Sequence, residues 1–170
     1  VAHSENTNTQ YNDGSANKLF DNLWTPDKAN EKHVEFWGRN NNDDHAAVPY
    51  ILTFDLGENP HEYNSIGLIP RLQWVGNSPK YLKIEVSDEV LTRSEDITNW
   101  ILVGSAKRDA FTKTELDAHD GGNWNDWYAD KQFVKWHDLG ENMHHRYIRF
   151  SMWDSWYSTH CFDEIFVSKK

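Results

Sequence analysis

The chain has 170 residues, of which 17 are Lys or Arg and 27 are Asp or Glu, so its formal net charge is −10. A surface of this sign repels nucleic acid and anionic lipid, and no apolar run approaches the roughly 20 residues that span a bilayer, so we expect no nucleic-acid partner and no membrane insertion. The single cysteine, Cys161, excludes an intrachain disulfide, whereas 9 Trp, 7 Tyr and 8 Phe indicate that some rings lie outside the core.

Alternating hydrophobicity predicts strands along much of the chain. In 50–56 (YILTFDL), every second residue is large and apolar, and the residues between include Thr53 and Asp55. The ranges 81–87 (YLKIEVS) and 147–152 (YIRFSM) follow the same period, and we expect Glu85 of the first range to face water. A period of two is typical of a strand with one face on the core and the other in solvent.

Shorter apolar runs predict further strands at 65–70 (SIGLIP), 100–106 (WILVGSA) and 164–168 (EIFVS), separated by Gly, Pro, Asn and Asp. No stretch carries an apolar stripe at helical spacing. We therefore predict an all-β chain in which antiparallel sheets pack face to face as a sandwich or jelly roll. Residues 107–135 have the weakest pattern, and we expect mostly a loop there, with one strand or one short helical turn.

The order of short motifs resembles the coagulation factor 5/8 type C, or discoidin, domain, whose bacterial members include the family 32 carbohydrate-binding modules. The motifs, which span 16–168, are ANKLFDN (16–22), PYILTFDLG (49–57), SIGLIPR (65–71), YLKIEVSDE (81–89), NWILVG (99–104), RYIRF (146–150) and FDEIFV (162–167). The resemblance implies an eight-stranded antiparallel jelly-roll β-sandwich of the galactose-binding-domain-like type, with binding loops at one end. We therefore assign 1–15 to an N-terminal extension or linker and 16–170 to one discoidin-like domain.

The resemblance also implies a structural calcium ion that ties the two chain ends together. The expected ligands are the carbonyls of Lys18, Leu23 and Asp163 and the carboxylates of Asp21 and Glu164. Oxygen ligands of this kind are those that calcium prefers. The sequence departs from the family pattern at Asn22, where Gly is usual, and in a lengthened loop over 24–36. In the alternative interpretation, Asp21 and Glu164 only hydrogen-bond to loop backbone.

A sugar presents a flat face of C–H groups and a rim of hydroxyls, so its binding site combines an aromatic platform with a few fixed polar side chains. The family resemblance places Arg71, Asn77 and His45 in the polar part of such a site. Trp74 lies in the same loop as Arg71, and the stretch after residue 152 adds three more rings. The expected ligand-binding residues are Arg71, Trp74, Asn77, His45, Trp153, Trp156 and Tyr157.

Each of these residues has a plainer interpretation. Arg71 can pair with a carboxylate, Asn77 follows a glycine and is a turn signal, and His45 can be a solvated loop residue. At least one ring of 153–157 should pack over the end of the core. By the resemblance Trp100 packs in the core, whereas Trp136 fits either a core or a surface position.

No catalytic motif is present: the sequence has no His-Glu-x-x-His, no Gly-x-Ser-x-Gly and no phosphate-binding glycine loop. We therefore expect a non-catalytic module that binds a glycan or oligosaccharide, with other domains of a larger chain as further partners. From the resemblance we expect a secreted or cell-surface bacterial protein. Because the residues VAHSENTNTQ at the start show no signal peptide, we expect its export signal to be absent from this sequence. The alternative is a protein-interaction or cell-adhesion domain on the same scaffold, because exposed Trp and Tyr also occur at protein interfaces.

Overall fold

A computed structural model describes the backbone of residues 2–5, 8–10, 34–37, 50–70, 78–89, 99–104, 107–118, 134–156 and 160–170. The side chains are described from residue 51 onward within these ranges, except at 160–163. The strands of the described ranges are β1 (Ala2–Glu5), β2 (Asn8–Gln10), β3 (Val34–Trp37), β4 (Tyr50–Asp55), β5 (Tyr63–Pro70), β6 (Pro79–Ser87), β7 (Ile101–Leu102), β8 (Arg108–Asp109), β9 (Lys135–Met143), β10 (Tyr147–Ser155) and β11 (His160–Ser168), and the helix is α2 (Lys113–Asp117).

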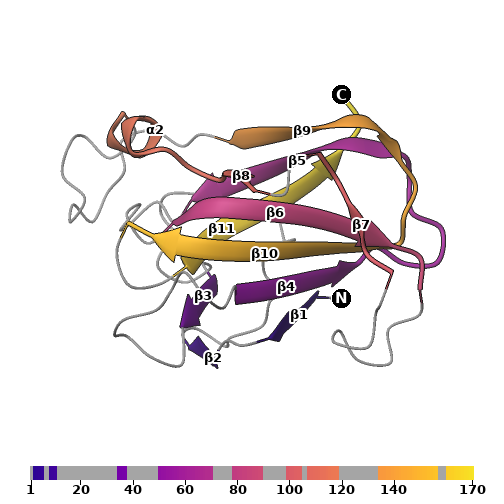
Figure 1. Cartoon of the computed structure of the whole chain (residues 1–170), viewed down its shortest axis with the longest axis horizontal. Helices are drawn as coiled ribbons and strands as arrows, with labels where there is room; N and C mark the ends of the chain where they lie inside the picture. The colour runs from indigo at the N-terminus through magenta and orange to yellow at the C-terminus, as the bar shows by residue number, and fades with distance from the viewer. Residues whose placement is uncertain are drawn as a thin grey trace.

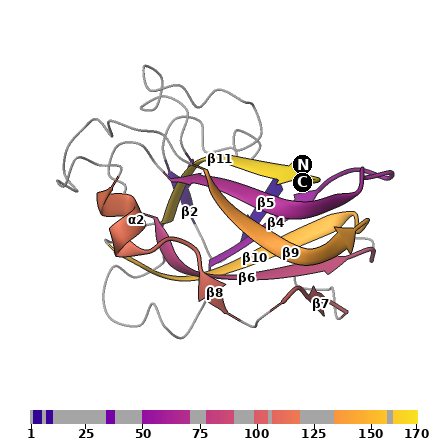
Figure 2. The same cartoon turned by 90° about the horizontal axis from the view of Figure 1, so that it is seen from above.

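The strands form two antiparallel sheets, which confirms the predicted β-sandwich (Figure 1). The six-stranded sheet has the order β1-β4-β10-β6-β7, with β8 also paired to β6, and the five-stranded sheet has the order β2-β3-β11-β5-β9. Figure 2 shows β11 and β5 of one sheet above β10 and β6 of the other. The strands β4, β5, β6, β10 and β11 are those that the sequence predicts, and β7 falls within the predicted range 100–106. The nine-residue strand β9 and the short strands β1, β2 and β3 were not predicted.

The first ten residues contribute to both sheets. Strand β1 pairs with β4, with Ala2 opposite Phe54, and β2 pairs with β3, with Asn8 opposite Trp37. We assigned residues 1–15 to an extension or linker because the family motifs begin at residue 16, and AHSE and NTQ carry no apolar alternation that would predict strands. Edge strands need only backbone hydrogen bonds to join a sheet, so polar residues can form them.

The core lies between the sheets and consists of the side chains that the alternating pattern placed on one face. Phe54 of β4 and Phe150 of β10 meet there edge to face, with ring centroids 5.0 Å apart and an interplanar angle of 78°. Other core residues are Leu52, Ile66, Leu68, Leu82, Ile84, Val86, Ile148, Met152 and Ile165. The alternation along β4, β6 and β10 therefore predicts the buried face of each strand correctly.

The predicted short helical turn is α2, which a capping box begins. The Oγ1 atom of Thr112 accepts a hydrogen bond from the backbone N–H of Glu115, and the Glu115 carboxylate accepts one from the N–H of Thr112. These bonds satisfy N–H groups that the first turn of a helix leaves without intrahelical partners. Within the described ranges, no helix has the length and hydropathy needed to cross a bilayer.

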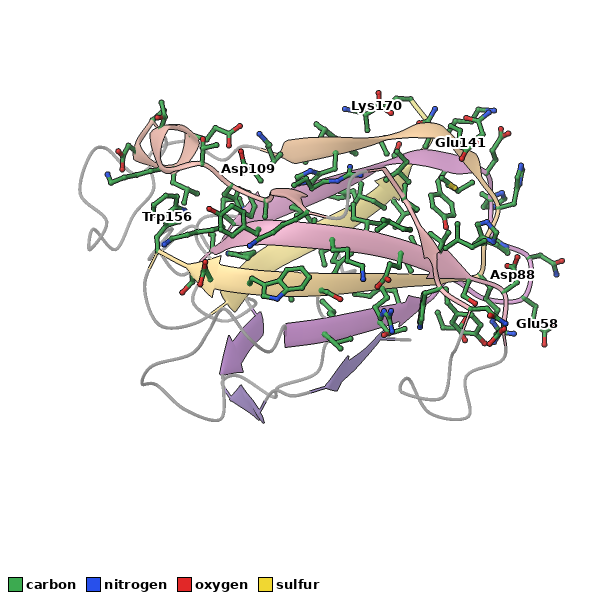
Figure 3. The ribbon with its side chains drawn as sticks, viewed as in Figure 1. Glu58, Asp88, Asp109, Glu141, Trp156 and Lys170 are labelled. Carbon is green, nitrogen blue, oxygen red and sulfur yellow. The ribbon has the colours of Figure 1, made fainter. Side chains whose placement is uncertain are left out.

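A hydrogen-bonded cluster closes the end of the sandwich where β4 stops and β10 starts. Arg146 donates from Nε and Nη2 to the two carboxylate oxygens of Asp55, each at 2.7 Å. The Arg146 guanidinium lowers the pKa of Asp55. Asp88 accepts from the Arg146 backbone N–H at 2.9 Å and lies 2.7 Å from Nδ1 of His145. Glu58 and Asp88 mark this end in Figure 3, far from Trp156.

Candidate functional site

The start of β4, the end of β5, the start of β6 and the end of β10 lie at the same end of the sandwich, on the left of Figure 1. Strand β10 ends beside the start of β6, where Ser155 pairs with Pro79, and Met152 pairs with Tyr50 at the start of β4. In the other sheet, β11 begins where β5 ends, with Phe162 opposite Pro70. The sequence segments that continue from these strand ends are 38–49, 71–77 and 157–159.

Trp156 lies at this end and lines a pocket of about 190 Å³. The half-buried ring of Trp156 packs against the core, and the Nζ atom of Lys80 lies 4.5 Å from the ring centroid. The other lining residues are Tyr81, Asp109, Phe111, Thr112 and Lys113. Trp156 therefore both closes the end of the core and forms one wall of the pocket, and Figure 3 shows it on the same side of the molecule as Asp109.

Trp153 lies on the outer face of the six-stranded sheet and not in the pocket wall. It is directly opposite Tyr81 in the pairing of β10 with β6. The Nζ atom of Lys107 lies 4.0 Å from the Tyr81 ring centroid and 5.7 Å from that of Trp153. Since Tyr81 also lines the pocket, a surface of three rings leads from the pocket onto the sheet.

The pocket wall formed by residues 107–118 was not foreseen from the sequence. Asp109 belongs to β8, while Thr112 and Lys113 lie at the start of α2. The Lys113 ammonium pairs with the carboxylate of Asp117 at 2.7 Å. The Thr-x-x-Glu spacing of 112–115 is a capping-box signal that predicts the helix start, but no sequence pattern indicates that this helix faces Trp156.

Other expected ligand-binding residues lie outside the described residues. These are Arg71, Trp74, Asn77, His45 and Tyr157. Their segments connect to strands that end at the Trp156 side, so their assignment to one site stays a prediction. The expected metal ligands Lys18, Asp21 and Leu23 also fall outside the described residues.

The described part of the expected calcium site is in β11. Glu164 is only 1% exposed, and a buried carboxylate requires hydrogen bonds or a cation nearby. The pairing of β11 with β5 shifts register between Phe162 and Glu164, so Asp163 has no partner residue in that ladder. A residue omitted from a ladder at a bulge is free to direct its carbonyl elsewhere. Among the described side chains, no group of three or more His, Cys, Asp or Glu is arranged to hold a metal.

Two expectations for the outer face of the six-stranded sheet were wrong. Trp100 does not pack in the core but lies over Arg149, whose Cζ is 4.2 Å from the ring centroid. Glu85 is buried rather than exposed, and it accepts a hydrogen bond from Nε of Arg149 at 2.8 Å while pairing with Lys83 at 2.7 Å. Paired charges and an aromatic ring cover this face, and strand alternation alone does not reveal such a cover.

The sequence matches no protein-family model and no curated protein. Its structure is similar to the family 32 module of Clostridium perfringens NanJ in complex with galactose, with TM-score 0.60 and 15% identity over 98% of this chain and 91% of that one. A two-module structure of Clostridium perfringens ZmpB in complex with GalNAc gives TM-score 0.64 and 14% identity over 100% of this chain and 34% of that one.

A third similar structure is the family 32 module of AlyQ in complex with 4,5-unsaturated mannuronic acid, with TM-score 0.56 and 11% identity. That alignment covers 98% of this chain and 92% of the other. Because these likenesses extend over nearly the whole chain, they show that it has the β-sandwich fold of the family 32 modules. The structural similarity establishes the fold, and at these low identities the function needs its own argument.

Proposed function

We propose that this chain is a non-catalytic carbohydrate-binding module that binds a glycan at the Trp156 end of the sandwich. The observation that carries the proposal is the pocket in which an aromatic ring meets an ammonium, a carboxylate and a hydroxyl, from Lys80, Asp109 and Thr112. A ring supplies a platform for the C–H face of a sugar, and the polar groups orient its hydroxyls. The similar structures that hold galactose, GalNAc or an unsaturated mannuronic acid support this ligand class.

The predicted residues of 71–77, together with His45 and Tyr157, complete the site in this proposal. Their segments join strands that end beside Trp156. Arg71 and Asn77 supply hydrogen-bond donors, and Trp74 supplies a second ring. Trp153 and Tyr81 extend the contact surface toward the sheet, which suits an oligosaccharide longer than one sugar.

The proposed module acts as one part of a larger secreted or cell-surface bacterial protein and has no catalytic role of its own. A shallow site buries little area and desolvates many hydroxyls, so the affinity for one sugar is weak. Attachment to further domains or repeated modules raises the overall affinity through effective concentration.

A calcium ion bound by Glu164 and the carbonyl of Asp163, together with Lys18, Asp21 and Leu23, has a structural role in this proposal. The burial of Glu164 and the register shift at Asp163 fit this ligand set. The ion supplies positive charge that compensates a buried carboxylate. Chelator should therefore lower the melting temperature, and added calcium should restore it, because a ligand of the folded state stabilises that state.

The test of glycan binding is calorimetric titration with galactose, GalNAc and their oligosaccharides, each with the wild type and with Trp156→Phe. The Phe variant keeps an apolar ring against the core but reduces the platform, so it should weaken binding while leaving the fold unchanged. Trp100→Phe is the matched control, because Trp100 lies over Arg149 on the sheet face. Equal affinity of the wild type and Trp156→Phe would remove Trp156 from the site.

One observation favours the alternative role in protein interaction. Ile101 and Leu102 of edge strand β7 are 53% and 43% exposed, and an exposed apolar edge can pair with a partner strand. If no sugar binds to the wild type, this strand and the Trp156 end are the surfaces to map with a protein partner.

A further inference from the structure

Trp136 is an exposed ring on the outer face of the five-stranded sheet, at the edge strand β9. Trp136 is 37% exposed. In the described ranges, the other large apolar side chains that are exposed are Ile101 and Leu102. The proposed glycan site does not use Trp136, since the pocket at Trp156 is lined by β6, β8 and α2 residues. Trp136 therefore requires an explanation of its own.

The backbone beneath Trp136 fixes the orientation of its ring. Trp136 is opposite Gly67 of β5, and Gly67 is opposite Phe166 of β11, so the three residues form a row across the sheet. A Cβ atom at Gly67 would lie 2.9 Å from the Trp136 ring, which is closer than a side chain tolerates. The Trp136 and Phe166 rings are stacked, with centroids 6.2 Å apart and an interplanar angle of 29°. The glycine thus lets the two rings meet over the strand, and Trp136 is held in place before any ligand arrives.

Polar side chains surround a pocket of about 260 Å³ beside this ring. The neighbouring pair across β5 and β9 is Ser65 with Asp138, both of which line the pocket. Asp138 is oriented by the backbone N–H of Gly140, which donates to its Oδ1 at 2.7 Å. The exposed carboxylate provides hydrogen-bond acceptors next to an aromatic platform.

Lys170 provides hydrogen-bond donors to the same pocket. Asn64 holds the Lys170 backbone, since its Oδ1 accepts from the Lys170 N–H at 2.8 Å and its Nδ2 donates to the Lys170 carbonyl at 3.1 Å. The Nζ atom of Lys170 lies 3.7 Å from the Trp136 ring centroid. An exposed contact between an ammonium and a ring is weak, so this flexible side chain can move aside and donate to the hydroxyls of a ligand.

We propose that Trp136, Asp138 and Lys170 form a second carbohydrate-binding site, which takes a pyranose ring of a neutral glycan. The fixed ring is the platform for the C–H face, Asp138 accepts from hydroxyls and Lys170 donates to them. A carboxylate and an ammonium lie on the same rim, so a ligand of either charge gains from one and is repelled by the other. Hydroxyls interact favourably with both groups, and we therefore expect the ligand to be a neutral glycan.

The second site is separate from the first. Figure 3 shows Lys170, which lines the second pocket, away from Trp156. The two pockets share no lining residue. One module can therefore contact two chains, or two parts of one chain, and this doubles its valency on a polysaccharide surface. Trp136, Asp138 and Lys170 belong to a different pocket from Trp156, so the second site does not depend on the first.

The test follows the indole N–H signals of the tryptophans by two-dimensional nuclear magnetic resonance, with galactohexaose, mannohexaose and N-acetylchitohexaose as probes. The signals of Trp136 and Trp156 are identified by their loss in Trp136→Phe and Trp156→Phe. We expect the Trp136 signal to shift and saturate with at least one probe, with a midpoint that is unchanged in Trp156→Phe. A stationary Trp136 signal with all three probes overturns the inference.

The Trp136 and Trp156 signals test the second site and the first site separately. A shift of the Trp156 signal alone rejects only the second site, whereas silence of both signals rejects both proposals. Asp138→Asn tests the rim, because it preserves the acceptor for Gly140 but removes the charge. In Asp138→Asn we expect the ligand concentration at half-saturation of the Trp136 signal to rise at least threefold over the wild type, and that of the Trp156 signal to stay unchanged. Equal half-saturation of the Trp136 signal in the variant and the wild type would exclude Asp138 from the second site. Glu141→Gln, a neighbouring exposed acid outside the pocket lining, is the matched control.

Discussion

The ammonium of Lys80 lies 4.5 Å from the centroid of the Trp156 ring, so a charged donor and an aromatic platform share the same wall of the pocket. Lys80 is the first residue after Pro79 at the start of β6, and Trp156 follows Ser155 at the end of β10. The pairing of Pro79 with Ser155 places them together. Two residues 76 positions apart, 156 minus 80, thus form one candidate contact surface.

Replacing Lys80 with Met should weaken glycan binding about five- to tenfold, which corresponds to the loss of roughly 1 kcal/mol for one hydrogen bond. Methionine keeps an apolar stem over Trp156 but cannot donate. Titration calorimetry measures the change. Lys83→Met is the matched control, since Lys83 pairs with Glu85 on the sheet face and does not line the pocket. The prediction fails if both variants bind with wild-type affinity.

Replacing Arg71 with Ala should abolish measurable sugar binding and leave the melting temperature unchanged. The reason is that a guanidinium presents several fixed donors, which a small polar ligand uses together. Equilibrium dialysis against the best sugar of the panel measures binding, and thermal melting monitors the fold. Arg108→Ala is an unsuitable control, because Arg108 donates to the carbonyls of Val103 and Asp138. An Arg71→Lys variant with wild-type affinity would show that charge alone is sufficient.

His137 should make the protein less stable as the pH falls from 7.5 to 5. The pKa of this side chain is lowered to about 4, mainly by burial and also by the positive charges of Arg108 and Lys135, against an opposing effect of Glu115. Below the unfolded-state value of 6.5, the unfolded chain binds a proton that the folded chain rejects, so the unfolded state gains stability. The expected loss over this range is about 2 kcal/mol in the free energy of unfolding.

Urea unfolding at a series of pH values measures this effect. His137→Gln removes the titrating group, so its free energy of unfolding should fall by about 2 kcal/mol less than that of the wild type over the same range. The other histidines contribute equally to both proteins and cancel in the comparison. Parallel pH profiles for the two proteins would contradict the prediction.

Replacing Asp55 with Asn should destabilise the fold by about 1–2 kcal/mol without altering glycan binding, because it weakens a charge-assisted pair. The pair joins the end of β4 to the start of β10, away from Trp156. Since Arg146 lowers the pKa of Asp55, this stability is present above the usual value of 3.8 and is lost as the pH falls below it. Chemical unfolding at pH 7 and pH 3 measures both effects, with exposed Glu141→Gln as control. An equal loss at both pH values would show that the charge is not the cause.

The sequence by itself determined the class of fold and the strands β4, β5, β6, β10 and β11, whereas β3 and β9 were not predicted. The alternation in β4, β6 and β10 predicts which face is buried, because burying one face of a pleated strand requires apolar residues at every second position. The order of motifs predicts the sandwich, and the Thr-x-x-Glu spacing at 112–115 is a local signal for α2. Strands β1 and β2 escaped prediction, because backbone pairing at a sheet edge leaves no mark on the side-chain pattern.

Only the tertiary structure decided which side chains meet. The pocket at Trp156 combines β6, β8 and α2 with the end of β10, and the row of Phe166, Gly67 and Trp136 joins three strands from distant parts of the chain. The sequence did not decide whether Trp136 lies in the core or on the surface. The cross-strand register places it over a glycine on the outer face. Periodicity reports the face on which a residue lies, whereas its neighbour depends on strand order and register, which are set by the packing of the whole chain.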